Sequence, residues 1–265
     1  MKTNFFLAAS LAFAGAACAQ PITIETSAVA PAADADSGGL LKDLVVMRAL
    51  KPEVYVAPAM SAAMQIAVVS KGRVRVAVMA DPEGMPADWL ILSYSHKDLA
   101  DSTLNVLRKW RFKPANIEGV PVAAQTEFDI EFRGSDVVTI SPVMDQLEYL
   151  YRNMGIERIE YRPCPLRELD RIPLLLNAVT PHYSLVARDQ GVRGSVEVQF
   201  YIDESGTVRL PAVLNADRVD LAKSALEAVR QWKFEPPTRN GHPVLISAIQ
   251  QFDFGKDTTA VTKIN

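Results

Sequence analysis

The sequence contains nearly the same phrase twice, and this repeat limits the possible folds more than any other feature. Residues 106–122 read VLRKWRFKPANIEGVPV, and residues 228–244 read AVRQWKFEPPTRNGHPV. Matching residues such as Trp110 and Trp232 lie 122 positions apart, and the match extends without a gap to the strands around it. A duplicated segment of this length predicts two domains of the same fold, joined in tandem.

Each copy has the pattern of a small two-layer unit. Alternating apolar and polar residues over 195–202 predict a strand, and DESG at 203–206 predicts a turn. Asp220 offers an N-cap to a helix whose apolar stripe continues to Trp232. Asn-Gly at 240–241 then predicts a tight turn before a long strand over 244–254. The fold class is therefore α+β: two small two-layer domains, each an antiparallel three-stranded sheet with a helix packed on one face.

The composition changes along the chain predict the domain boundaries. A helix is expected over 143–155 in the connector, where apolar residues recur at helical spacing before Gly155. The expected segments are a signal peptide at 1–19, a flexible lead-in at 20–45, a first domain at 46–134, a helical and Pro-rich connector at 135–172, a second domain at 173–256 and a tail at 257–265.

The N-terminal stretch predicts export. MKTNFFLAASLAFAGAACAQ has one lysine, an apolar run and then small residues, which is the layout of a cleavable secretory signal. We expect cleavage after Ala19 and a periplasmic protein; lipidation of Cys18, which would make a membrane-attached lipoprotein, is the alternative. After cleavage Cys164 is the one remaining cysteine, either an inert small apolar residue or the site of an intermolecular disulfide.

Charge and motifs argue against several function classes. A net charge of -3 and a pI near 5.7 do not favour nucleic-acid binding. The three histidines are widely separated, and the sequence has neither the spacing of a metal site nor a nucleophile elbow or phosphate loop. We therefore expect no enzyme: no catalytic residue, no cofactor and no metal.

The repeated unit resembles the C-terminal domain of the TonB family. In the second copy the resemblance rests on Tyr183, VEVQFYIDESGTV, LAKSALEAVRQWKFEPP, NGHPV and FDF, and in the first on GRVRVAVMADPEG, LADSTLNVLRKWRFKPA, EGVPV and FDIEF. The resemblance implies an outer-membrane TonB-dependent transporter as partner and energy-coupled transmembrane transport as the process. It also implies inner-membrane motor proteins as partners, although the sequence has no evident anchor apart from the signal-like run.

The same resemblance implies partner binding by strand addition to the last strand of a copy, which is 122–132 or 244–254. In the second copy Tyr201, Leu245 and Ile249 are expected on an exposed, partly apolar face that binds either a partner or the sibling domain. The partner-binding set is Tyr183, Tyr201, Val244, Leu245, Ile246, Ser247, Ala248, Ile249, Gln250, Gln251 and Phe252.

The outer face of the first copy looks more polar. Acidic residues alternate along its last strand, and we expect this face to be solvated, with Arg73 and Arg75 pairing with those acids. Two functions follow from these patterns. One is an energy transducer, or an accessory to one, that binds transporter segments; the other is a cell-envelope scaffold whose two repeats pair with each other, with self-association as a further outcome.

Overall fold

The computed structural model describes residues 41, 44–59, 71–117, 119–133, 137–142, 160–183, 189–255 and 263–264. The predicted signal peptide with Cys18, and the helix expected over 143–155, lie outside these residues. Within the described ranges, no helix has both the length and the apolar character needed to cross a membrane.

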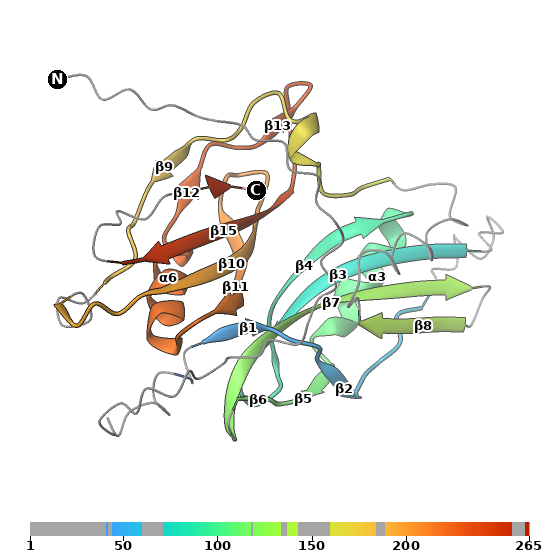
Figure 1. Ribbon diagram of the computed structural model, residues 1–265. Helices are drawn as coiled ribbons and strands as arrows, with labels where there is room; N and C mark the ends of the chain where they lie inside the picture. Colours follow the sequence, from blue (N-terminus) through green and yellow to red (C-terminus); the bar gives the residue numbers. More distant parts are fainter. Residues whose placement is uncertain are drawn as a thin grey trace.

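The two copies have the same order of elements, at the constant offset seen in the sequence (Figure 1). The first copy comprises β3 (Lys71–Ala80), β4 (Pro86–Tyr94), α3 (Lys97–Leu107), β5 (Arg111–Lys113), β6 (Ala115–Ile117) and β7 (Val120–Arg133). The second comprises β10 (Gly194–Ile202), β11 (Val208–Ala216), α6 (Val219–Arg230), β12 (Lys233–Phe234), β13 (Thr238–Arg239), β14 (His242–Pro243) and β15 (Ile246–Phe254). Their elements therefore correspond, except that the single last strand β7 of the first copy is divided into β14 and β15 in the second.

The α+β class is confirmed, but the expected pair of separate three-stranded sheets is not. One ten-stranded sheet passes through both copies, in the order β16-β15-β10-β11-β1-β7-β3-β4, with β6 and β8 also paired to β7. The joining strand is β1 (Val45–Met47), which pairs in parallel with β7 on one side and β11 on the other. The further strands are β8 (Val137–Pro142) and β16 (Lys263–Ile264).

Strand β1 changes the interpretation of the segment expected to be a flexible lead-in. Leu41, Leu44, Val45 and Val46 are all buried, and they belong to the main hydrophobic core. Their burial removes apolar surface from water, which favours an ordered position over a mobile one. Residues 44–47 are therefore part of the fold and not of a flexible lead-in.

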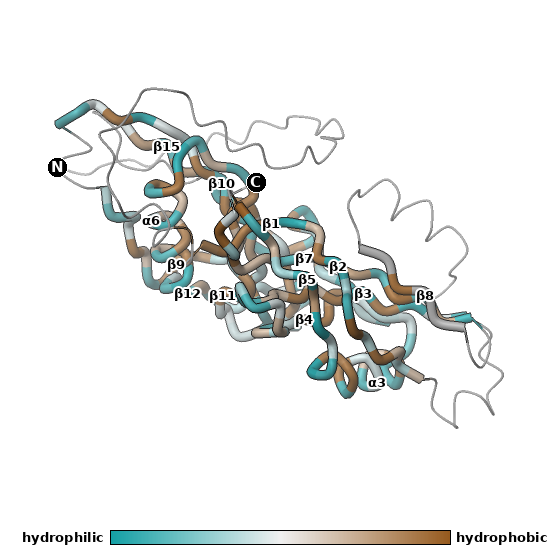
Figure 2. The backbone as a smooth tube through the Cα atoms, turned by 90° about the horizontal axis from the view of Figure 1, so that it is seen from below, coloured by the Kyte–Doolittle hydropathy of each residue, from teal (hydrophilic) through white to brown (hydrophobic). Residues whose placement is uncertain are grey.

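Short elements upstream of each copy complete the two layers. β2 (Lys51–Val54) pairs with β5, and β9 (Leu175–Asn177) pairs with β12. Between the copies, residues 160–165 lead into a short 3-10 helix, Leu166–Glu168. The helices α3 and α6 lie on the two halves of the molecule, well separated from each other (Figure 2).

The two repeated tryptophans fill equivalent places in the core, as predicted. Trp110 is 0% exposed and Trp232 is 5% exposed. Each indole N–H donates to a backbone carbonyl of the upstream segment: Trp110 to Val56 at 3.0 Å and Trp232 to Val179 at 2.8 Å. These bonds satisfy the only polar group of a buried indole and bind the upstream segment to the core.

The helix starts differ from the prediction. The N-cap of α6 is Arg218, and no side chain caps it; Asp220 lies one residue inside the first turn. Its carboxylate accepts hydrogen bonds from Arg218 at 3.0 and 3.1 Å. The first-turn position still favours a negative charge, because the positive end of the helix dipole lies there. The acidic residue therefore acts through charge and not as a cap.

Each copy has a glycine at a place where two backbone segments lie very close to each other. Gly84 and Gly206 have φ of +83° and +78°, and a Cβ there would lie 2.0 and 2.1 Å from the carbonyl oxygens of Phe112 and Phe234. The carbonyls of these glycines also accept the Phe112 and Phe234 amide N–H groups, at 2.8 and 2.9 Å. Only glycine combines positive φ with such a close contact.

Candidate partner-binding edge

The outer faces of the two copies, opposite the helices, are packed against each other. A compact apolar cluster joins Ala77 and Leu92 of the first copy to Tyr201 and Leu210 of the second, together with Leu245. Tyr201 is 1% exposed and Leu245 is 0% exposed. These two side chains are therefore not exposed: of the two expected uses of their apolar face, contact with the sibling copy is the one that the structure shows.

Ion pairs and hydrogen bonds surround this apolar cluster. The Tyr201 hydroxyl donates to Glu127 of the first copy, and Glu127 is also paired with Arg75. Burial, and then the negative charge of Glu127, raise the pKa of Tyr201 well above its ordinary value. Its hydroxyl therefore remains a hydrogen-bond donor, since ionisation would place two negative groups side by side.

The acid–base pairing predicted for the first copy is confirmed, but its solvated setting is not. Arg73 Nε lies 3.3 Å from Asp129 Oδ1, and both side chains are about nine-tenths buried or more. The second copy contacts this face at Glu127, which accepts the Tyr201 hydroxyl. A further pair crosses between copies, where Arg209 Nη2 lies 2.8 Å from Asp88 Oδ1.

The last strand of the first copy, β7, has partners along both sides. On one side β3 pairs with it from Ala124 to Arg133. On the other, β1 pairs at residues 123–125 and β8 at residues 128–133. The backbone groups that an added strand needs are therefore already paired, and β7 is a poor candidate for strand addition.

The last strand of the second copy, β15, has fewer strand partners than β7. Strand β10 pairs with it along its whole length, from Ile246 to Phe254. On its other side, in the part of the chain that the structure describes, β16 pairs at Gln250 and Gln251 alone. Backbone positions 246–249 and 252–254 have no strand partner there, so β15 forms the edge of the sheet at this end of the molecule (Figure 1).

Side chains of β15 alternate strictly between core and solvent. Ile246, Ala248, Gln250, Phe252 and Phe254 are buried, whereas Ser247, Gln251 and Asp253 are exposed and Ile249 is half-buried. An added strand would continue this alternation, with one set of its side chains beside the core face and the other beside Ser247 and Ile249.

Tyr183 lies at the far end of the same strand. Its ring contacts Phe254 edge-on, with centroids 5.6 Å apart, and its hydroxyl donates to the Val192 carbonyl. The structure thus brings together Tyr183 and residues 246–252 of the predicted set. It does not bring Tyr201 or Leu245 to that edge, because both lie in the contact between the copies.

The expected strand start at Val244 is also corrected, since β15 begins at Ile246. The Val244 amide N–H donates to the Pro237 carbonyl at 2.9 Å, and the Leu245 carbonyl accepts from the Cys164 amide N–H at 2.7 Å. These two residues are held by the connector and by the β13–β14 turn. Asn240 and Gly241 form that turn with φ of +51° and +75°, as their sequence predicted.

Sequence reasoning missed β1 and β8, the strands that pair with β7 and so make it less open to strand addition than β15. The run Leu44–Met47 is apolar throughout and carried no assignment, because four residues are too few to display a period. Its continuous apolar character is what a strand buried on both faces needs, and this was the signal that could have identified β1.

These features define a class: a tandem α+β protein with a pairing-competent edge on one copy. The family of the C-terminal part of the Gram-negative bacterial TonB protein matches residues 58–133 and 179–255, together more than half of the chain. The chain therefore belongs to the TonB C-terminal family and contains two copies of its domain.

A curated relative supports the same assignment. A stretch of 77 residues is 35% identical to protein TonB of Vibrio cholerae serotype O1. The match covers 29% of this chain and 32% of that protein, so the chain spans about a third of the length of the relative that it matches.

Proposed function

We propose that this protein binds extended segments of outer-membrane transporters by strand addition at β15, in support of energy-coupled transport. The observation that carries the proposal is the difference between the two last strands: β7 has strand partners on both sides, whereas among the described residues β15 has none on the side away from β10 at positions 246–249 and 252–254. Membership of the TonB C-terminal family supports the identity of the partner. The role requires binding alone, with no catalytic group, cofactor or metal.

Strand addition fits the chemistry of this edge. An extended peptide would satisfy the free N–H and C=O groups of β15, and these main-chain bonds give affinity for many sequences. Specificity would come from side chains near Ser247, Ile249 and Tyr183. Asp253 is exposed on the same face, so a segment carrying a basic residue opposite it is favoured.

The short strand β16 must leave before a peptide can pair along the whole edge. It occupies Gln250 and Gln251, in the middle of β15. Removing residues 256–265 should therefore increase the affinity for a peptide, because the competing strand is gone. A tenfold gain would correspond to about 1.4 kcal/mol.

The test is hydrogen exchange on residues 20–265, with and without synthetic peptides taken from N-terminal segments of TonB-dependent transporters. We expect new amide protection confined to residues 246–254, and no change in β7. The control peptide carries proline at its centre, which removes a donor and should abolish protection. Ile249→Lys changes the edge itself and should weaken binding. Protection of β7 alone, or saturable binding that neither change affects, would refute the proposal.

The second candidate is an envelope scaffold whose repeats pair with each other. The observation that favours it is that β1 and the Tyr201 cluster unite the copies in one sheet. In that case the β15 amides that do not bond to β10 should be protected without peptide and unchanged by it. Both candidates place the protein in the periplasm, and fractionation of cells expressing the full chain tests that location, with a lipid label at Cys18 testing attachment to a membrane.

A further inference from the structure

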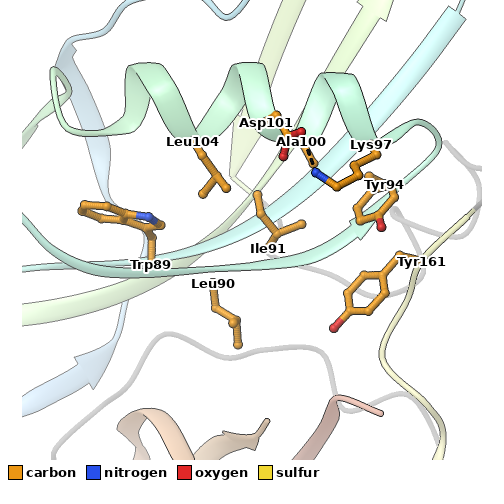
Figure 3. A pocket seen from close by; sticks show the side chains of 9 residues that line it. All are labelled: Trp89, Leu90, Ile91, Tyr94, Lys97, Ala100, Asp101, Leu104 and Tyr161. Carbon is orange, nitrogen blue, oxygen red and sulfur yellow. Dashed lines mark hydrogen bonds and ion pairs between the residues drawn. The ribbon is translucent and has the colours of Figure 1, made fainter. Parts of the chain in front are cut away.

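A groove lies along the opposite edge of the sheet, at β4 of the first copy. It has a volume of about 380 Å³, within the range of roughly 300–1,000 Å³ typical of ligand sites. The lining residues that matter here are Trp89, Leu90, Ile91, Tyr94, Leu104 and Tyr161, and Figure 3 shows how they lie around the strand. Trp89 and Ile91 lie on the side of helix α3 with Leu104, whereas Leu90 and Tyr161 lie on the other side of the strand.

Both ends of this edge are closed, and its middle is not. At one end the Tyr94 carbonyl accepts from the amide groups of Glu160 and Tyr161, and the rings of Tyr94 and Tyr161 are stacked 5.3 Å apart. At the other, Arg209 Nη2 donates to the Trp89 carbonyl at 3.3 Å. Between them, over residues 90–92, no strand of the described part of the chain pairs with β4 on the side away from β3.

The second copy shows what fills the equivalent place. Ile91 corresponds to Val213 in the repeat, and Val213 is the residue of β11 that pairs with Val46 of β1. Strand β1 lies against that edge in parallel, with Leu44 and Val46 each 1% exposed. An extended aliphatic segment is therefore the natural occupant of this edge in the fold.

Because β1 covers this edge in the second copy, apolar residues there should be more buried than their counterparts in the first copy, and they are. Val213 is 2% exposed and Leu226 of α6 is 1% exposed, whereas their counterparts Ile91 and Leu104 are only half-buried. The first copy thus exposes, at the β4 edge, apolar surface that its sibling buries. Half-buried aromatic and aliphatic side chains beside an unpaired strand favour a partner that supplies both backbone groups and apolar side chains.

We propose that the groove between β4 and α3 is a second peptide-binding site, which takes an extended aliphatic segment of another protein as a parallel strand. The three residues of β1 match the length of the open stretch 90–92. Alternate side chains of the bound segment would lie over Ile91 and Leu104 on one side and over Leu90 and Tyr161 on the other. A second copy of this chain cannot readily donate its own β1, because that strand is held between β7 and β11.

The probe is an acetylated peptide with the sequence of residues 40–48, LLKDLVVMR, which carries the chemistry accepted by the second copy. It is added to residues 20–265 and followed by hydrogen exchange. We expect saturable binding with protection confined to residues 89–94. A control peptide with aspartate in place of both central valines should give none, because charged side chains are disfavoured in an apolar groove.

Two protein variants separate this site from the β15 edge. Leu104→Arg places a charge on a half-buried helix position and should weaken binding of the probe at least tenfold, with an unchanged circular dichroism spectrum. Ile249→Lys, at the far end of the sheet, should leave probe binding unchanged and weaken transporter peptides instead. If one site does not bind its peptide, binding at the other can therefore still be tested. Leu90→Arg, on the other side of the strand, provides a second variant should Leu104→Arg fold poorly.

Several results would overturn the proposal. These are absence of saturation at millimolar probe, protection before the probe is added of those amides of residues 90–92 that do not bond to β3, or exchange changes at residues 123–125 and 213, which would mean that the probe replaces β1. Concentration-dependent dimerisation lost in Leu104→Arg would assign the groove to a second copy of this chain and refute the assignment to another protein.

Discussion

The hydroxyl of Tyr201 offers a direct test of the contact between the two copies. Tyr201→Phe keeps the ring, and therefore the apolar cluster with Ala77 and Leu210, but removes the donor to Glu127. Hydrogen bonds to charged groups contribute roughly 1.5–3 kcal/mol. Because Glu127 keeps its ion pair with Arg75, we expect the lower part of that range, a loss of about 2 kcal/mol in the free energy of unfolding.

Equilibrium unfolding in urea, followed by tryptophan fluorescence, measures this loss. Since both copies share one sheet, we expect a single transition, and a loss of this size should lower the melting temperature by about 4–8 °C. Tyr183→Phe is the matched control: its hydroxyl bonds a neutral carbonyl, and its removal should cost about 0.5–1.5 kcal/mol.

A double-mutant cycle decides whether the effect crosses between copies. Tyr201→Phe and Glu127→Gln should be strongly non-additive, with a coupling of about 1 kcal/mol or more, because the two groups contact each other. Two results would refute a buried charge-assisted hydrogen bond at this contact. One is a loss in the free energy of unfolding for Tyr201→Phe no larger than that for Tyr183→Phe, and the other is additive effects in the cycle.

Three further predictions follow from the same structure. Gly206→Ala should destabilise the protein by about 2–4 kcal/mol and Gly241→Ala by about 1–2, because both have positive φ but only the first brings a Cβ against the Phe234 carbonyl; equal losses in urea unfolding would contradict the clash. Stability should be complete below about pH 10 and fall as the pH rises above it, because the folded-state pKa of Tyr201 is raised, and Tyr201→Phe should flatten that fall in alkaline melts. Burial raises the pKa of the Cys164 thiol, so it should react with a thiol reagent far more slowly in the native protein than in urea, and native samples should contain no disulfide-linked dimer on non-reducing gels.

The duplication has produced two copies with different available edges. In the first, β1 and β8 pair with the last strand and leave the β4 edge open; in the second, β1 covers the β11 edge and leaves most of the last strand open. Strand β1 thus closes one edge in each copy at the same time. The protein thus presents an edge at each end of one sheet, and the two proposals above assign one extended segment to each.

The local elements of each copy were predictable from sequence because neighbouring residues decide them. Alternation over 195–202 predicted β10, the apolar stripe before Trp232 predicted α6, and Asn240 with Gly241 predicted the turn. The buried role of both tryptophans followed from the same pattern. Of the candidate site, residues 246–252 and Tyr183 do lie at one edge, although Tyr183 is far from Phe254, its ring contact, in the chain; the family resemblance, and not a local pattern, pointed to Tyr183.

What only the tertiary structure decided is which edge remains free. Tyr201 and Leu245 look like an exposed docking face until the sibling copy covers them, and β7 looks as available as β15 until β1 and β8 pair with it. These contacts are made by strands of a few residues, too short for a period of their own. The partners of β1 lie tens of positions away on β7 and more than a hundred away on β11, so its pairing depends on where the whole chain brings them; β8 instead follows β7 directly in the chain. The sequence determined two similar units, and packing between the units made them unequal.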